Sequence, residues 1–264
     1  AVVRLAADPA IHYIEAAARL KPALSPAAPV RPGPFDLSAV PLPPSALDRA
    51  VLDAGVDRLR QLSRGEFIGL TGRGVIIGIY DSGLDLEHAD FLTADGRTRV
   101  LWAWDQSAPF GPAPGQVGPH TFDYGLECGP ADIDARTCPL TDRVGHGTHV
   151  AGIAAGDGSA TTPGLAPFRY TGVAPLADLI VVKGGDNEYT TDRMIDGVAY
   201  IFERAAALGR PAVVNVSLGS QQGPHDGTTL VEQALDRLVG PGRLLVVAAG
   251  NDGVNRNESP AVAS

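Results

Sequence analysis

The sequence predicts an α/β domain built on a mostly parallel central sheet with helices on its faces. Short aliphatic and β-branched runs alternate with amphipathic helical segments along most of the chain, the pattern that gives such a sheet. Several runs are apolar throughout, as expected for strands buried on both faces. A length of 264 residues and a hydrophobic content of 44% are enough for one sizeable core.

Five segments are expected to be the strands of this sheet. They share short length and a high content of Val, Ile and Leu: Val75–Tyr80, Arg99–Trp104, Leu179–Lys183, Ala212–Ser217 and Leu244–Ala249.

Two helices are predicted between the later strands. The first is capped by Thr191 or Asp192 and ended by Gly209 and Pro211. The second covers Thr228–Val239. Each has one apolar face that is expected to point inward. In the first helix this face consists of Met194, Ile195, Val198, Ile201, Phe202 and Ala205. In the second it consists of Leu230, Val231, Ala234, Leu235 and Leu238.

Composition divides the chain into three regions. Residues 1–24 form a small separate element with a strand-like segment at 11–15. Residues 25–60 are a linker and lead-in, because accumulated prolines favour an extended connection. Residues 61–264 carry the α/β pattern, interrupted between Trp104 and Asp142 by a long irregular insertion rich in Gly and Pro.

Charge and hydropathy exclude two classes of partner. The net charge is −9 and no run of Lys and Arg occurs, which argues against binding to nucleic acid. No apolar run approaches the ~20 residues that span a bilayer, so no membrane span is expected. Neither property indicates an oligomeric state.

Cys128 and Cys138 are the only two cysteines. They fall in the same Gly- and Pro-rich segment, so a local disulfide is one interpretation and two free thiols is another. A structural zinc site is disfavoured, because such a site needs four ligands and only His120 lies nearby as a third.

Polar residues at strand ends are the candidates for chemistry, because reactive groups in open α/β sheets gather at the carboxyl ends of the strands. Asp81 follows the first strand, Ser217 closes the fourth and Asn251 follows the fifth, so the three are expected to share one rim. His146 begins a helix of small residues and has a glycine on either side, which allows another group to approach it closely.

Four segments resemble the successive signature blocks of the subtilase family of serine endopeptidases. They are YDSGLD around Asp81, GHGTHVAGIAAG around His146, NVSLGS at Asn215–Ser220 and VVAAGND near Asn251, in the order of the family. The resemblance implies a subtilisin-like three-layer domain that is incomplete at its C-terminus. It also implies hydrolysis of peptide bonds in a polypeptide substrate by an Asp-His-Ser triad.

Three residues take catalytic roles under this resemblance. Asp81 orients the imidazole and stabilises its protonated form, and His146 acts as general base and then general acid. Asn251 donates its side-chain amide to the developing oxyanion.

Two edges of a substrate cleft are implied in the same way. Ser217, Leu218 and Gly219 resemble the edge to which an extended peptide adds as a strand. Gly184 and Gly185, in the segment 184–187, are expected at the opposite edge.

The nucleophile is the departure from the family pattern. The family carries its serine in a Gly-Thr-Ser block downstream of the oxyanion amide, and no such block follows Asn251 here, although Ser259 and Ser264 do. Either the sequence is part of a longer precursor, or the serine comes from another chain. This chain by itself is expected to be nearly inert.

The rival interpretation is a catalytically dead subtilase-like module that binds peptides or regulates. A nucleotide-binding fold is disfavoured because no GxGxxG follows a strand.

The N-terminal region supports the precursor interpretation. The segment LAADPAIHYIE resembles the last strand of the inhibitory propeptide of many subtilases, and the chain begins without Met. The resemblance therefore implies a propeptide that acts as inhibitor and chaperone, and a secreted or extracytoplasmic protein. TRVLWAWDQ and the ending NDGVNRNESPAVAS further resemble bacterial subtilases with a β-rich insertion before the serine.

Metal sites are weakly indicated. His146 and His149 have the spacing of a ligand pair, but no acidic third ligand accompanies them. Calcium is common in the family, and Asp85 and the loop after Ala155 are its candidate ligands here, although no acidic cluster has a defined ligand spacing. No metal ligand is therefore assigned.

Overall fold

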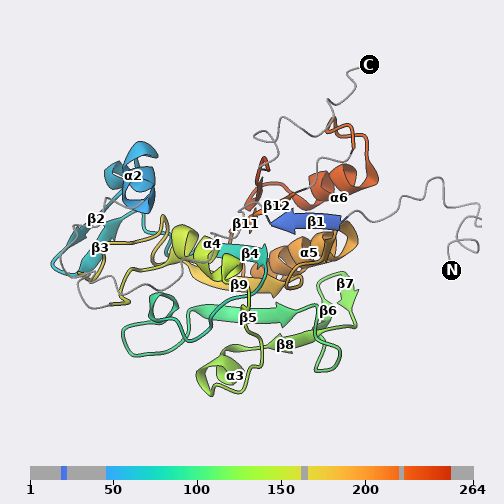
Figure 1. Ribbon diagram of the computed structural model, residues 1–264, viewed down its shortest axis with the longest axis horizontal. Coiled ribbons are helices and arrows are strands. Elements are labelled where there is room, and N and C mark those ends of the chain that lie inside the picture. Colours follow the sequence, from blue (N-terminus) through green and yellow to red (C-terminus); the bar gives the residue numbers. More distant parts are fainter. Residues whose placement is uncertain (1–18, 23–45, 162–165, 220–222, 251–264) are drawn as a thin grey trace, which may run out of the picture.

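A six-stranded sheet forms the centre of the molecule, in the order β13-β11-β4-β9-β5-β8 (Figure 1). The computed structural model describes residues 19–22, 46–161, 166–219 and 223–250. The inner strands and one edge strand run parallel, and they are β4 (Ile76–Asp81), β5 (Val100–Asp105), β9 (Asp178–Lys183), β11 (Ala212–Val216) and β13 (Arg243–Val247). The other edge strand, β8 (Leu126–Cys128), is antiparallel to β5. The predicted α/β class with a mostly parallel sheet is confirmed, and the five predicted strands occur with ends shifted by one or two residues.

Helices cover both faces of this sheet. Helix α5 (Thr191–Ala207) packs on one face, and α4 (His146–Ala155) packs on the other. The alternation along β4 divides the core between them, since Ile76 and Tyr80 join the cluster on the α5 side whereas Ile77 and Ile79 join the cluster on the α4 side. The fold therefore has three layers, with the carboxyl ends of the parallel strands along one rim.

The close approach of α5 to the sheet depends on a glycine. A Cβ atom at Gly78 would lie 2.6 Å from Cγ2 of Ile201, so no larger residue fits at this position of β4. The helix can consequently bury its apolar face directly against the strand that leads to Asp81.

Helix α6 (Leu230–Leu238) departs from the predicted burial. Its five apolar residues were expected to face inward, but none of its residues is buried and Leu230 is 37% exposed. The helix packs on α5, with Val231, Leu235 and Leu238 partly buried against the core on that side. The predicted inward face is thus confirmed for Val231, Leu235 and Leu238, whereas Leu230 is more exposed than predicted.

The insertion between Trp104 and Asp142 is more regular than the sequence suggested. It contains the hairpin β6 (Gly115–Val117) and β7 (His120–Phe122), the edge strand β8 and the short helix α3 (Pro130–Asp134). Rings from the insertion pack against Trp104 and Tyr200, with centroids 5.2 Å apart for Trp104 and Phe122 and 5.7 Å for Phe122 and Tyr200. Aromatic packing therefore fixes the insertion to β5 and α5.

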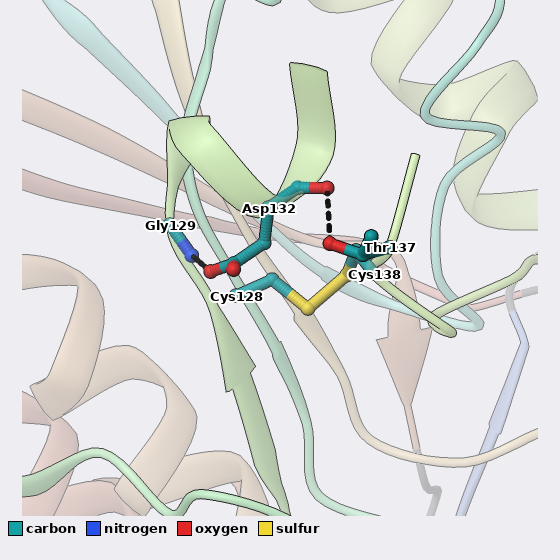
Figure 2. Close-up of a disulfide and its surroundings, with 5 residues drawn as sticks. All are labelled: Cys128, Gly129, Asp132, Thr137 and Cys138. Atoms are coloured by element: carbon teal, nitrogen blue, oxygen red, sulfur yellow. Dashed lines mark hydrogen bonds between the residues drawn. A yellow bond between two sulfur atoms is a disulfide. The ribbon is translucent and has the colours of Figure 1, made fainter. Parts of the chain in front are cut away.

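A disulfide between Cys128 and Cys138 closes this region (Figure 2). The bond joins the end of β8 to the segment after α3. Inside the loop, the Asp132 carboxylate accepts a hydrogen bond from the Gly129 amide at 3.0 Å, and the Asp132 carbonyl accepts one from the Thr137 hydroxyl at 3.1 Å. Of the interpretations left open by the sequence, the structure has the disulfide.

A helix and a hairpin precede the central sheet. Helix α2 (Ala46–Asp53) lies within the range 25–60 that the sequence analysis assigned to a linker and lead-in. A hairpin of β2 (Arg60–Ser63) and β3 (Glu66–Gly69) follows it. The predicted strand at 11–15 and the proline-rich residues 23–45 lie outside the residues that the structure describes. No helix in the described ranges has the length and apolar character needed to cross a membrane.

Candidate active site

Asp81 ends β4 at the rim of the sheet and is fully buried. Its Oδ1 atom accepts a hydrogen bond from the Ser82 amide at 2.7 Å. A buried carboxylate is costly unless it is paired and hydrogen-bonded, so its position at this strand end requires partners.

His146 is that partner. Its Nδ1 atom lies 2.6 Å from Oδ1 of Asp81, and the residue is only 8% exposed. The hydrogen bond to Asp81 raises the pKa of His146, burial opposes the rise, and the charges of Asp81 and Asp142 add to it. Within the described part of the chain, Nε2 of His146 is buried without a hydrogen-bond partner. The ring is thus held through Nδ1, while Nε2 has no hydrogen-bond partner among the described residues.

Glycines bring the two residues together. Gly145 precedes α4 with a φ of 79°, a left-handed conformation that favours glycine. A Cβ atom at Gly147 would lie 2.2 Å from the Gly83 carbonyl oxygen, so the first turn of α4 packs directly on the chain that leaves β4. Small neighbours of His146 were predicted to allow close approach, and the approaching group is this backbone.

A second carboxylate, Asp142, lies just before α4 and was missed by the sequence analysis. It hydrogen-bonds to Ser82 on one side and to Thr148 on the other, at 2.8 Å and 2.7 Å between oxygens. The usual capping signal does not point to it, because the N-cap residue of α4 is Gly145, three residues after Asp142.

A three-stranded sheet lies next to this site. The strand β1 (Arg19–Pro22) pairs antiparallel with β10 (Tyr189–Thr190) on one side and with β12 (Leu218–Gly219) on the other. Figure 1 shows β1 beside β12. The register sets Leu20 opposite Tyr189 and Pro22 opposite Leu218. An N-terminal segment of the chain therefore occupies the gap between two edges that are distant from it in sequence.

Some of the predicted cleft residues lie in the strands of this sheet, and others lie in the segments beside them. Leu218 and Gly219 form β12, which pairs with β1, and Ser217 connects β11 to β12. The strand on the opposite side is Tyr189–Thr190, whereas Gly184 and Gly185 lie in the loop ahead of it. Gly184 donates its amide to the Asp81 carbonyl at 2.9 Å, and a Cβ atom there would lie 2.4 Å from the Tyr80 hydroxyl. In the structure, Gly184 thus contacts the strand of Asp81, and the β10 pair was not identified from the sequence.

Asn251 lies outside the described residues, immediately after Gly250. The chain that leads to it is placed, since the Ala248 amide donates to the Val216 carbonyl at 3.0 Å. Strand β13 therefore runs beside β11, and Ala248, which follows β13, bonds to Val216, the last residue of β11.

The candidate calcium positions, Asp85 and the loop after Ala155, have other contacts in the part of the chain that the structure describes. Among the described residues, no three His, Cys, Asp or Glu side chains are arranged to hold a metal ion. The Asp85 carboxylate accepts a hydrogen bond from the Glu87 amide at 3.1 Å. The end of α4 is instead held by the buried Arg99 guanidinium, which donates to the carbonyls of Ala155 at 2.7 Å and Ala177 at 2.6 Å.

Comparison with known proteins identifies the family. Residues 72–264 match the model of Peptidase_S8, the subtilase family. This match covers more than half of the chain, which therefore belongs to the subtilase family of subtilisin-like serine proteases.

Individual relatives match over part of their length. The subtilisin-like protease PopC of Myxococcus xanthus is 31% identical over 208 residues, which are 73% of this chain and 36% of PopC. A subtilisin of Bacillus sp. is 39% identical over 115 residues, 43% of this chain and 25% of that protein. The structure of the CspB protease of Clostridium perfringens aligns with a TM-score of 0.59 and 28% identity, over 70% of this chain and 38% of CspB. The chain thus spans well under half of the length of these relatives.

Proposed function

We propose that this protein is a serine endopeptidase of the subtilisin type. In the proposed mechanism Asp81 fixes the tautomer of His146 and stabilises the imidazolium that forms during attack. His146 removes the proton of the nucleophile through Nε2 and later protonates the leaving amine. The nucleophile is a serine outside these 264 residues.

One observation carries the proposal: a polypeptide strand lies between β10 and β12 beside the Asp81–His146 pair. Addition of an extended peptide between two strands is a recurring mode of peptide recognition, in which main-chain hydrogen bonds supply affinity. A groove that binds extended polypeptide next to a general base supports a peptide as substrate.

The direction of β1 supports the same conclusion. Because β1 is antiparallel to β12, its direction from Lys21 to Pro22 is toward the Ser217 end of β12. Ser217 follows Val216, which pairs with Tyr80, the neighbour of Asp81. A peptide bound like β1 would therefore carry the bonds that follow it to the rim where the His146 ring lies.

The proposal gives the N-terminal residues 1–24 the role of an internal inhibitor and folding aid. As long as β1 occupies the groove, substrate is excluded from it. Cleavage of a bond shortly after Pro22 would release the segment.

Asn251 is proposed as the oxyanion donor. An amide suits this role because its N–H can donate to the developing negative charge, whereas a carboxylate would repel it. In the family's namesake, subtilisin, loss of such a donor costs roughly 10²–10³-fold in kcat.

A secreted or extracytoplasmic location completes the proposal. The Cys128–Cys138 disulfide supports it, since disulfides form and persist mainly in oxidising compartments.

Labelling of the full-length protein with a fluorophosphonate probe tests the proposal. We expect the probe to modify one serine beyond residue 264, identified by mass mapping, and we expect His146→Ala to abolish the reaction. Asp85→Asn, which changes an exposed carboxylate outside the pair, should leave labelling unchanged. A folded full-length protein that does not react would favour the catalytically dead peptide-binding module.

A further inference from the structure

The carboxylate of Asp142 is saturated by donors from both sides of the active site. Oδ1 accepts from the Ser82 hydroxyl at 2.8 Å, the Gly145 amide at 2.8 Å and the Val144 amide at 3.2 Å. Oδ2 accepts from the amide of Thr148 at 2.8 Å and from its hydroxyl at 2.7 Å. This one side chain therefore joins the strand end after Asp81, the loop before α4 and the first turn of α4.

The two hydroxyls bound by Asp142 form a reciprocal connection. The Ser82 oxygen, on the β4 side, accepts from the Gly147 amide of α4 at 2.9 Å. The Thr148 oxygen, on α4, accepts from the Asp85 amide on the β4 side at 2.9 Å. Each hydroxyl can accept in this direction because its own proton is directed at Asp142.

His146 lies inside this connection. The Gly147 amide that binds Ser82 follows His146 directly, and the Ser82 amide binds the same Asp81 oxygen that His146 approaches. A shift of α4 relative to β4 would change the 2.6 Å distance between Oδ1 of Asp81 and Nδ1 of His146. The hydroxyl connections oppose such a shift.

We infer that Asp142 is a positioning residue for His146, which acts by orienting the Ser82 and Thr148 hydroxyls that join the start of α4 to the end of β4. The inference rests on the proposed function for its catalytic consequence, since it assigns His146 the role of general base. The hydrogen bonds of Asp142 among the described residues go to Ser82, Val144, Gly145 and Thr148, and its proposed role is to act on His146 through them.

The charge of Asp142 supports the same role. Burial opposes ionisation of Asp142, but the hydrogen bonds from Thr148, Ser82 and Gly145 outweigh it and lower its pKa. The ionised group adds to the effect of Asp81 in raising the pKa of His146.

Other charged or titratable groups near the pair come from β9 and β10. The buried Lys183 ends β9 and donates to the Thr141 carbonyl at 2.8 Å, next to Asp142, and to the Asp186 carboxylate at 2.5 Å. Tyr189 of β10 has a raised pKa, mainly because of burial and further because of Asp81 and Asp142.

The test is Asp142→Asn in the full-length protein. Both oxygens of Asp142 accept hydrogen bonds from backbone N–H groups, which can only donate. The Asn side chain has an NH2 group in place of one oxygen, so this NH2 group must face one of those N–H donors. The hydroxyl on that side, of Ser82 or of Thr148, then loses the acceptor that fixes its orientation. We expect the amide that this hydroxyl accepts from, Gly147 for Ser82 or Asp85 for Thr148, to exchange hydrogen roughly fivefold faster or more, because loss of one neutral hydrogen bond weakens its protection by about that factor.

Two further readouts separate positioning from a general loss of stability. The pKa of His146, followed by NMR of the labelled imidazole and assigned with His146→Gln, should fall. Peptide hydrolysis should lose about 10²-fold in kcat, the scale of a small misplacement of a catalytic group, with KM little changed because β10 and β12 are not altered.

The matched control is Asp226→Asn. Asp226 accepts from the amide of Thr228 at 3.1 Å and from its hydroxyl at 2.6 Å, the same pair of bonds that Asp142 makes with Thr148, but it lies in the segment before α6. This variant should leave the Gly147 and Asp85 amides, the titration of His146 and kcat unchanged.

If Asp142→Asn does not fold, two variants that each remove one of the bound hydroxyls test the same inference. Ser82→Ala should release the Gly147 amide only, and Thr148→Val the Asp85 amide only, each with a partial loss of kcat. The inference is overturned if Asp142→Asn behaves like Asp226→Asn in exchange and titration, or if both single variants leave His146 and kcat unaltered. Exchange and titration need no catalytic serine, so they remain informative even if the protein proves to be no peptidase.

Discussion

At the residue scale, the Asp81–His146 pair determines how the site responds to pH. The hydrogen bond to Asp81 places the pKa of His146 above its usual value in the folded protein. A general base must be neutral to act, so the rate of fluorophosphonate labelling should rise with pH through this elevated pKa. A profile whose midpoint lies at or below the ordinary histidine value of about 6.5 would contradict the pairing.

The same pair links pH to stability with the opposite sign. Because the pKa of His146 is higher in the folded than in the unfolded state, the protonated pair stabilises the fold at pH values below about 6.5. That contribution is lost as pH rises through the folded pKa. In denaturant titrations, the difference in unfolding free energy between the wild type and His146→Gln should therefore shrink with increasing pH. A constant difference would indicate that the ring contributes packing alone.

Gly147 is the residue on which the contact between α4 and the β4 end depends. A Cβ at this position meets the Gly83 carbonyl oxygen at 2.2 Å, so Gly147→Ala should destabilise by roughly 1–3 kcal/mol and lower the labelling rate. Gly152→Ala is the control in the same helix, because its Cβ would meet nothing within 4 Å. That change should be neutral or stabilise by up to about 1 kcal/mol. Equal effects in thermal unfolding would refute the steric argument.

At the scale of elements, the disulfide holds the antiparallel edge of the sheet. Cys128 ends β8, and Glu127 beside it binds Arg204 and Tyr200 of α5, so the edge strand is fixed from two directions. Replacing both cysteines by alanine should lower the unfolding free energy by about 2–3 kcal/mol, as expected for a loop of this length. Reductant should destabilise the wild type by a similar amount and leave the double variant unaffected. A wild type insensitive to reductant would mean that the bond adds no stability.

At the scale of the whole molecule, β1 closes the proposed substrate groove with the protein's own chain. A tethered segment acts at an effective concentration of about millimolar. Removal of residues 1–24 after folding should therefore speed fluorophosphonate labelling by at least roughly tenfold. A synthetic peptide of residues 11–24 should slow it again, and a scrambled peptide should not. Unchanged labelling after removal would show that β1 does not block the site.

The sequence alone predicted the parallel strands of the sheet, the position of Asp81 at their carboxyl ends and the resemblance to the subtilase family. Continuous apolar runs such as β4 and β9 predict buried parallel strands, and the resemblance of the blocks around Asp81 and His146 to the subtilase signatures implies that the two residues pair. Each of these signals lies within a few consecutive residues. The tertiary structure decided what depends on packing between distant segments. It placed β1 between β10 and β12, left Leu230 of α6 37% exposed, and gathered Ser82 and Thr148 around the Asp142 carboxylate. Local pattern carries the first kind of information, whereas contacts between residues far apart in sequence leave no periodic signal in the chain.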